Sequence, residues 1–291
     1  MKKRRITAFG LALFVLMMLA TSASGLSLAG EGPDPFPRGE EVAVKVMSYN
    51  IHHGVGEDGV LDLNRIAGVI REAGADLVGL QEVDKHYGAR SNFEDQAKKL
   101  SELLGMHVAF GANLDRDPLE EGQPRRQYGT AVLSKYPIIR SENHFLSSFG
   151  SEQRGLLETT INVKGNHVHL FNTHLGLTVQ QRLAQVNEIL DIARKRQGTK
   201  IILGDFNAKP TSQEIATMTA QYNDGFAGMD DAFTYPASPA PTSRIDYIFT
   251  SPDVSLTERQ VLNGILASDH LPVVGTVVLN REAPFDNGLG E

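Results

Sequence analysis

Short apolar runs alternate with amphipathic stretches along most of this chain, and the two patterns predict strands and helices in turn. Apolar or alternating runs predict strands at residues 42–49, 76–80, 108–110, 130–133, 156–163, 167–173, 199–203, 245–249, 256–261 and 272–279. Helical spacing predicts helices at residues 63–73, 93–104, 179–196 and 213–219, with Asp62 as an N-cap and Gly105 as a stop. This alternation indicates a single α/β domain with mixed sheets.

Polar or ionisable side chains follow five of the predicted strands, where burial without partners would cost several kcal/mol. These strand ends are Ser48-Tyr49-Asn50, Gly79-Leu80-Gln81-Glu82, Asn172-Thr173-His174, Gly204-Asp205-Phe206-Asn207 and Ser268-Asp269-His270. A sixth segment, Arg244-Ile245-Asp246-Tyr247, places a carboxylate inside an apolar strand. Each one alone has an ordinary explanation as a turn, a cap or an ion pair. Their shared position along the strands indicates a functional site.

One arrangement occurs twice in the chain. A strand ends in Asn50, a helix follows, and the next strand ends at Glu82; later the same pattern runs from His174 to Asp205. Each copy has the length of a strand–helix–strand unit, which delivers polar groups to the carboxyl edge of a sheet. Two facing sheets would therefore bring both edges to one cleft.

The oxygen donors among these residues suit a hard divalent cation. Asn50, Glu82 and Asp269 offer a carboxamide and two carboxylates. A small set of oxygen ligands is typical of Mg²⁺ or Mn²⁺, which keep several waters and bind substrate phosphate directly. We therefore expect Mg²⁺ (or Mn²⁺) as the cofactor of a phosphoesterase.

The remaining polar groups suit activation of a water. Asp205 and Asn207 lie on the same side of an extended segment and could orient a water for attack on phosphorus. His270 can accept a proton if Asp246 fixes its tautomer. His174 could donate a hydrogen bond to a phosphate oxygen or to the leaving group.

Four of these segments resemble motifs of the endonuclease/exonuclease/phosphatase superfamily, which includes deoxyribonuclease I-like enzymes and bacterial sphingomyelinases. They are Leu80-Gln81-Glu82-Val83, Asn172-Thr173-His174-Leu175, Gly204-Asp205-Phe206-Asn207 and Ser268-Asp269-His270-Leu271-Pro272-Val273. The resemblance extends over residues 42–279. It implies a deoxyribonuclease I-like, four-layer α/β/β/α sandwich of two mixed β-sheets and metal-dependent phosphoester hydrolysis.

The resemblance also implies roles for individual residues. It assigns the metal to Glu82 and Asn50, with Asp269 as a further metal or histidine-orienting carboxylate. It assigns water and phosphate positioning to Asp205 and Asn207, and the acid/base pair to Asp246 and His270. His174 matches the deoxyribonuclease-like and sphingomyelinase-like members.

Weaker expectations concern the substrate phosphate. Arg154 resembles a phosphate-contacting arginine, Tyr128 lies where related enzymes present a residue to the phosphate, and Arg90 lies in a loop after Glu82. His52 and His53 could line the pocket or simply occupy the loop after the first strand. Arg116, Arg125 and Arg126 are candidates for a basic lip.

The first residues differ from the rest of the chain. Lys2-Lys3-Arg4-Arg5 precedes an uncharged apolar stretch over residues 6–20 and a small-residue segment over 21–25. This order is typical of a secretory signal peptide. We expect a signal peptide at residues 1–29, a Pro-rich linker at 30–41, the catalytic domain at 42–280 and a flexible tail at 281–291. The protein is then secreted or extracytoplasmic; the alternative is anchoring by an uncleaved N-terminal segment.

The net charge of the chain without its leader bears on the class of substrate. The leader holds four of the 28 basic residues and no acidic one, so the remaining chain has 24 basic and 35 acidic residues, a net charge of −11. An acidic body lacks the footprint that drives nonspecific DNA binding. A small phosphoester or lipid headgroup is therefore favoured, with a secreted nuclease as the alternative. We expect a monomer, and transient membrane-surface contact stays open.

The complete set of polar strand ends disfavours a catalytically inactive binding module on the same fold. The absence of cysteine excludes disulfides, thiolate metal sites and a lipid-anchor motif. Because no nucleophile elbow is present, a water activated by side chains is the expected nucleophile.

Overall fold

The computed structural model of the protein describes residues 41–280. The predicted signal peptide, the linker up to residue 40 and the tail at 281–291 lie outside the described residues, and these assignments stay predictions. Among the residues that are described, no helix combines the length and the apolar character that crossing a membrane requires.

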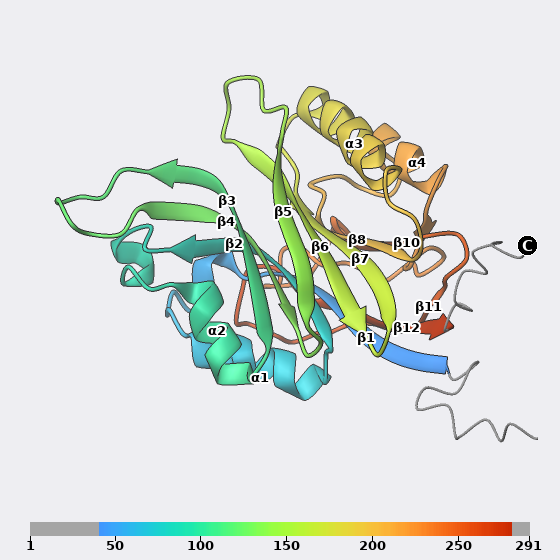
Figure 1. Cartoon of the computed structure of the whole chain (residues 1–291), viewed down its shortest axis with the longest axis horizontal. Coiled ribbons are helices and arrows are strands. Elements are labelled where there is room, and N and C mark those ends of the chain that lie inside the picture. Colours follow the sequence, from blue (N-terminus) through green and yellow to red (C-terminus); the bar gives the residue numbers. More distant parts are fainter. Residues whose placement is uncertain (1–40, 281–291) are drawn as a thin grey trace, which may run out of the picture. The chain divides into compact units, whose positions relative to one another are not determined.

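Residues 41–280 form two six-stranded sheets with four helices (Figure 1). The first sheet contains β1 (Glu41–Asn50), β2 (Leu77–Lys85), β3 (His107–Arg116), β4 (Arg126–Ser134), β11 (Leu256–Val261) and β12 (Val273–Asn280), in the order β11-β12-β1-β2-β4-β3. The second contains β5 (Ile138–Leu146), β6 (Arg154–Val163), β7 (Asn166–His174), β8 (Lys200–Asp205), β9 (Asn223–Asp224) and β10 (Asp246–Thr250), in the order β5-β6-β7-β8-β10-β9. The helices are α1 (Leu63–Ala73), α2 (Gln96–Leu104), α3 (Val179–Ala193) and α4 (Gln213–Thr219), with short 3-10 turns η1 (His52–Gly54) and η2 (Ala89–Ser91).

Each sheet contains one parallel pair of neighbouring strands. β1 pairs with β2 and β7 pairs with β8, and the helices α1 and α3 connect them. In register, Asn50 lies opposite Gln81 and His174 lies opposite Asp205. The two strand–helix–strand units predicted from the repeated arrangement are therefore both present, one in each sheet.

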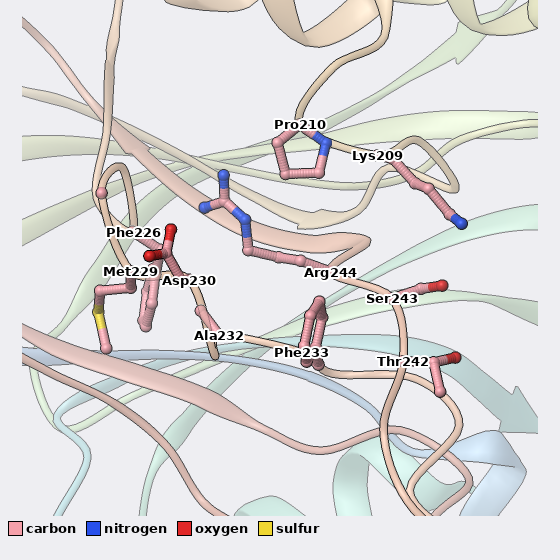
Figure 2. A pocket seen from close by; sticks show the side chains of 11 residues that line it. Lys209, Pro210, Phe226, Met229, Asp230, Ala232, Phe233, Thr242, Ser243 and Arg244 are labelled. Atoms are coloured by element: carbon pink, nitrogen blue, oxygen red, sulfur yellow. The ribbon is translucent and has the colours of Figure 1, made fainter.

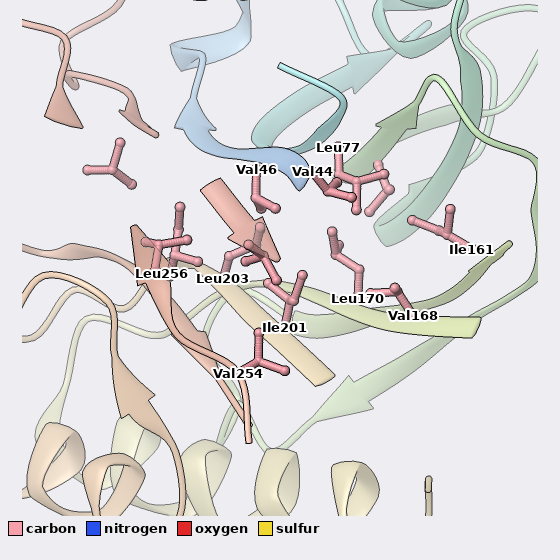
Figure 3. Close-up of a cluster of buried hydrophobic side chains, with 14 of the residues drawn as sticks. Val44, Val46, Leu77, Ile161, Val168, Leu170, Ile201, Leu203, Val254 and Leu256 are labelled. Carbon is pink, nitrogen blue, oxygen red and sulfur yellow. The ribbon is translucent and has the colours of Figure 1, made fainter. Parts of the chain in front are cut away.

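A layer of aliphatic side chains joins the two sheets face to face (Figure 3). Val44 and Val46 of β1 belong to this layer, together with Leu170 of β7. Met47 and Tyr49 alternate with them along β1 and belong to a second buried cluster on the outer side of the sheet. This period of two lets one strand contribute to two layers.

Helices cover the outer face of each sheet. Ile66 and Ile70 of α1 and Leu100 of α2 are buried on the first sheet. Val186 and Ile189 of α3 are buried on the second sheet, and Figure 1 shows α3 beside α4 on the side opposite α1 and α2. The predicted four-layer α/β/β/α sandwich is confirmed.

The second helix starts later than its spacing predicts. Asn92 and Phe93 have φ values of 51° and 55°, so the backbone there is left-handed rather than helical. The Asp95 carboxylate accepts the Lys98 N–H and caps a helix that begins at Gln96. Capping chemistry, rather than apolar spacing, sets this boundary.

Strand β5 has no counterpart in the predicted elements. It forms an edge of the second sheet, and most of its side chains are exposed. Most positions of Ile138–Leu146 are exposed, so the strand has no clear alternation of apolar and polar residues. The periodicity that identifies a strand in the sequence is therefore missing.

Candidate active site

Side chains from both sheets meet where the two parallel pairs end. Asn50, at the end of β1, donates from Nδ2 to Glu82 Oε1 at 3.1 Å and to Asp205 Oδ2 at 3.2 Å. The second bond crosses from one sheet to the other. One buried carboxamide therefore connects the polar ends of the two strand–helix–strand units.

The backbone is irregular at both strand ends. The pairing of β2 with β4 shifts register between Leu80 and Val83, and Glu82 has φ 58°. Asn207 has φ 49°, and its N–H donates to Asp205 Oδ1 at 2.8 Å. Left-handed backbones are uncommon for residues other than glycine and cluster at functional sites. The irregularities give Glu82 and Asn207 directions that a regular strand would not allow.

Gly204 permits a close approach of β7 and β8 just before Asp205. Its φ is 147°, and a Cβ added there would lie 2.0 Å from the backbone oxygen of Thr173. Any side chain at this position would force the strands apart. The glycine therefore helps to set the distance between His174 and Asp205.

Asp205 is the centre of the site. Its Oδ2 lies 3.4 Å from His174 Nε2 and 3.7 Å from His270 Nε2, in addition to its bond with Asn50. Burial raises the pKa of Asp205 to about 7; the positive charge of His270 opposes this shift, and the Asp246 carboxylate adds to it. The carboxyl group therefore holds a proton more readily than an exposed aspartate does.

His270 and Asp246 form the expected pair. The Nδ1 atom of His270 lies 2.9 Å from Asp246 Oδ2. Burial alone would lower the pKa of His270, but the carboxylates of Asp246 and Asp205 raise it to about 10. At neutral pH the ring is therefore an imidazolium that donates from Nδ1 to Asp246 and turns Nε2 toward Asp205.

The pKa of His174 is shifted in the opposite direction from that of His270. Burial holds its pKa well below the usual 6.5, and the positive charges of Arg154 and His270 lower it further. A neutral imidazole and an imidazolium therefore flank the Asp205 carboxyl group.

A cleft of about 340 Å³ opens over this group. The predicted site residues that line it are Glu82, Tyr128, Arg154, His174, Asp205, Asn207, Asp269 and His270. Asn50 and Asp246 lie behind this surface, and each makes a hydrogen bond to a residue that lines it. The structure thus brings ten of the eleven predicted residues to one site.

Arg90 is the exception. Its guanidinium donates two hydrogen bonds to the buried Asp84 carboxylate, at 2.9 and 2.7 Å, and lies 5.4 Å from the ring centre of Tyr128. The side chain is not among the residues that line the cleft, and its ion pair with Asp84 holds it beside Tyr128. The contact of Arg90 with substrate phosphate stays a prediction.

The other two weaker candidates do line the cleft. Arg154 is 6% exposed, and one guanidinium nitrogen lies 3.2 Å from Glu152 Oε1. Burial raises the pKa of Tyr128 well above 10, and the negative charge of Glu82 adds to the effect. Tyr128 is therefore a neutral hydroxyl, whereas Arg154 brings a positive charge.

Sequence reasoning missed Tyr235. Its ring lies 4.7 Å from the ring of His270, centre to centre, and it lines the cleft. Tyr235 opens the Pro-rich loop at 235–241, and a backbone bridge to Ser243 brings that loop back on itself. No local pattern links this loop to His270. Leu177, Glu152 and Ile245 complete the cleft wall and were also absent from the predicted site.

A second cavity of about 280 Å³ lies near the start of β10 (Figure 2). Arg244 lines it, but the guanidinium donates to both oxygens of Asp224 at 2.9 and 2.7 Å. Both side chains are less than 10% exposed, at 8% and 5%, so this ion pair anchors the segment that leads to Asp246. The Arg244 guanidinium in this cavity is therefore already paired, whereas Lys209 also lines it.

The cleft contains donors that fit a divalent cation. Glu82 shares a cluster with His52 and His53, in which one ligand atom of each lies within 4.8 Å of the others. Asp269 lines the same cleft. The carboxamide oxygen of Asn50, however, accepts the His52 N–H at 3.1 Å, and its Nδ2 faces Glu82. Asn50 thus turns its amide nitrogen, and not its oxygen, toward Glu82. Glu82 and Asp269 line the cleft, whereas His52 and His53 adjoin Glu82 and are not among the residues that line it.

Comparison with known proteins agrees with this geometry. A model of the Endonuclease/Exonuclease/phosphatase family matches residues 47–270. The uncharacterized protein YbhP of Escherichia coli (strain K12) is 30% identical over 179 residues, which cover 58% of this chain and 68% of YbhP.

Solved structures show the same fold. The endonuclease/exonuclease/phosphatase from Beutenbergia cavernae is 30% identical with a TM-score of 0.71, covering 82% of this chain and 72% of that one. A mannosyl-6-phosphatase of Bacteroides thetaiotaomicron is 20% identical with a TM-score of 0.63, covering 81% and 100%, and this likeness concerns the fold alone. The chain belongs to the endonuclease/exonuclease/phosphatase family, whose members are typically hydrolases of phosphoester bonds and usually use divalent metals.

Proposed function

We propose that this protein is an exported, divalent-metal-dependent phosphoesterase in which a water attacks the phosphorus. The observation that carries the proposal is the Asp205 carboxyl group, buried at the floor of the cleft between Asn50, His174 and His270. A carboxyl group whose pKa is about 7 can accept a proton from water near neutral pH.

In this mechanism Asp205 and Asn207 hold the attacking water, and Asp205 accepts its proton. The His270 imidazolium, oriented by Asp246, donates a hydrogen bond to a phosphoryl oxygen and stabilises the charge that develops there. This role differs from the proton acceptor expected from the sequence. The proposal follows from the carboxylates of Asp246 and Asp205, which raise the pKa of His270 and favour its protonated form.

Phosphate binding falls to Arg154 and His174. Arg154 is the one Lys or Arg side chain among the described residues that line the cleft, and its partner Glu152 has a side chain that is 44% exposed. A phosphate can therefore replace that exposed carboxylate as the partner of the guanidinium. His174, neutral and buried, donates to the phosphate or to the leaving group.

Glu82 is the central candidate for holding the cation, with Asp269 and the adjacent histidines as further donors. When bound, a divalent cation supplies Lewis-acid stabilisation of the charge on the phosphoryl group. Asn50 then orients Glu82 through its Nδ2.

A small phosphoester or a lipid headgroup is the substrate class that the cleft favours. Four carboxylates line it, from Glu82, Glu152, Asp205 and Asp269, against the single guanidinium of Arg154. Long nucleic acids need several cations along their backbone. Arg125, part of the predicted basic lip, pairs with two neighbouring acids instead.

An assay of the purified protein with bis-p-nitrophenyl phosphate tests the reaction. We expect hydrolysis with Mg²⁺ or Mn²⁺ and none after EDTA; full activity in EDTA would rule out the metal. A panel of plasmid DNA, RNA, sphingomyelin, phosphatidylinositol and inositol phosphates then identifies the substrate. Cleavage of plasmid DNA alone would replace the proposed substrate class with a nuclease activity.

Export rests on the predicted signal peptide at residues 1–29. Expression of the full chain in a bacterial host, followed by fractionation and N-terminal sequencing, tests this part. We expect a shortened protein outside the cytoplasm. A full-length protein that stays in the membrane fraction would support the anchored alternative.

A further inference from the structure

Two consecutive histidines follow β1 and approach Glu82. His52 and His53 both have φ 44°, so two left-handed residues occur in a row without glycine. Such a backbone is uncommon and needs surrounding structure to hold it. The turn brings a ligand atom of each ring to within 4.8 Å of one another and of a Glu82 carboxylate oxygen.

The ring of His52 is already oriented for ligation. Its Nδ1 atom lies 3.2 Å from the backbone oxygen of Val55. Because a carbonyl oxygen only accepts, the hydrogen of the neutral ring lies on Nδ1 and Nε2 carries a lone pair. Metal-binding histidines usually donate their other ring N–H to a carbonyl or carboxylate in this way.

The ring of His53 has an unpaired polar atom. Its Nδ1 is buried and has no hydrogen-bond partner among the described residues. The buried Gln96 side chain holds the segment in place, since it donates to His53 O at 2.6 Å and accepts the Asp84 N–H at 2.9 Å. Contact between the two histidine rings, whose centres are 4.4 Å apart, does not provide that missing partner.

Asn50 supports this arrangement. Its Oδ1 accepts the His52 N–H and thereby fixes the start of the histidine turn. Asp269 Oδ1 lies 3.9 Å from His52 Nδ1, the nitrogen that also faces Val55 O, so the cluster itself consists of His52, His53 and Glu82. The group therefore offers imidazole nitrogen and carboxylate oxygen side by side.

We infer that His52, His53 and Glu82 form a mixed nitrogen–oxygen cation site that selects a first-row transition-metal ion over Mg²⁺. Imidazole is a poor ligand for Mg²⁺ and a good one for transition metals. This inference specifies the metal site of the proposed function and rests on that function, because Glu82 is a ligand in both.

Binding of Mn²⁺ to the metal-free protein tests the site directly, without an activity assay. Electron spin echo envelope modulation should show nitrogen nuclei coupled to the bound Mn²⁺, and an excess of Mg²⁺ should leave this signal in place. His52→Gln and His53→Gln should each weaken Mn²⁺ binding at least about tenfold. His107→Gln, at an exposed position on β3, is the matched control and should bind Mn²⁺ like the unmodified protein.

The outcomes separate the two proposals. Mn²⁺ bound through oxygen alone, displacement by Mg²⁺, or no binding at all would overturn the histidine site. Since the spectrum of the unmodified protein is decisive, misfolding of a variant would not obscure the result. All-oxygen coordination together with EDTA-sensitive hydrolysis would leave the proposed function standing.

Discussion

The side chain of Gln81 donates a hydrogen bond to Asn172 Oδ1 at 2.7 Å, from β2 in one sheet to β7 in the other. Asn172 Nδ2 donates back to the backbone oxygens of Leu80 and Ala131, at 2.9 and 2.8 Å. Both amide side chains are fully buried. A polar connection between the sheets therefore lies directly beside two of the strand ends that form the cleft.

Replacing Asn172 by alanine should reduce the free energy of unfolding by about 3 kcal/mol, because two carbonyl oxygens and the Gln81 amide lose buried partners. Urea unfolding followed by circular dichroism measures the change. Asn187→Ala, on the exposed face of α3, is the control and should stay within about 0.5 kcal/mol. Equal midpoints for the two variants would show that the inter-sheet network contributes little.

Asp205→Asn should lower kcat by about 10²–10⁴ while the fold is kept, since the shape of the side chain stays and the proton acceptor is lost. Steady-state hydrolysis of bis-p-nitrophenyl phosphate gives the rate, and thermal unfolding reports on folding. Asp191→Asn, at an exposed position of α3, should leave the rate unchanged. Full turnover by Asp205→Asn would remove Asp205 from the mechanism.

Asp246→Asn should lower the pKa of His270 from about 10, because burial then acts with one fewer carboxylate to oppose it. A titration of the histidine ring signals by NMR follows the change. Asp253→Asn, in the exposed loop after β10, should leave the titration as it is. If His270 titrates identically in the Asp246 variant, the carboxylate is not the cause of the raised pKa.

Glu158→Gln should make the stability less dependent on pH. Burial would raise the pKa of Glu158, but hydrogen bonds from Arg196 and His144 lower it below the ordinary 4.5. A carboxylate with a lowered folded pKa stabilises the protein above the unfolded pKa and loses that contribution as the pH falls through the folded pKa.

The variant should thus be less stable than the unmodified protein by about 1–3 kcal/mol at pH 7, and the gap should narrow below about pH 4.5. Urea midpoints at pH 7 and at pH 3.5 measure it. Glu142→Gln, an exposed neighbour on β5, should show no gap at either pH. A gap that stays constant with pH would contradict the assigned ion pair.

Local sequence patterns were sufficient to predict which residues at the strand ends form the site. Asn50, Glu82, His174 and Asp205 each follow an apolar run, and polar groups at such places need partners. The two strand–helix–strand units then determine which edges meet, so the cleft followed from chain order together with the fold that the motifs implied. Asp62 as the N-cap of α1 is confirmed for the same reason, since capping is a local interaction.

Local sequence patterns did not predict contacts between segments that are far apart in the chain. Nothing near Tyr235 in the chain indicates that its ring lies against His270, and nothing near Arg90 indicates that Asp84 binds its guanidinium. The orientation of the Asn50 carboxamide likewise depends on the His52 N–H. These details arise from tertiary packing, where partners are chosen by space rather than by sequence separation.

The close strand contact at Gly204 means that the floor and the rim of the cleft differ in how much sequence change they tolerate. A Cβ at position 204 would clash with the Thr173 backbone, so no other residue fits there without moving β7 and β8 apart. The positions of His174 and Asp205 therefore cannot be changed by small substitutions at this contact. The rim is different, because Tyr235 and Leu177 stand on loops and Leu177 is 72% exposed. New substrates can therefore be accommodated by replacing rim side chains, while the chemistry beneath them is inherited unchanged.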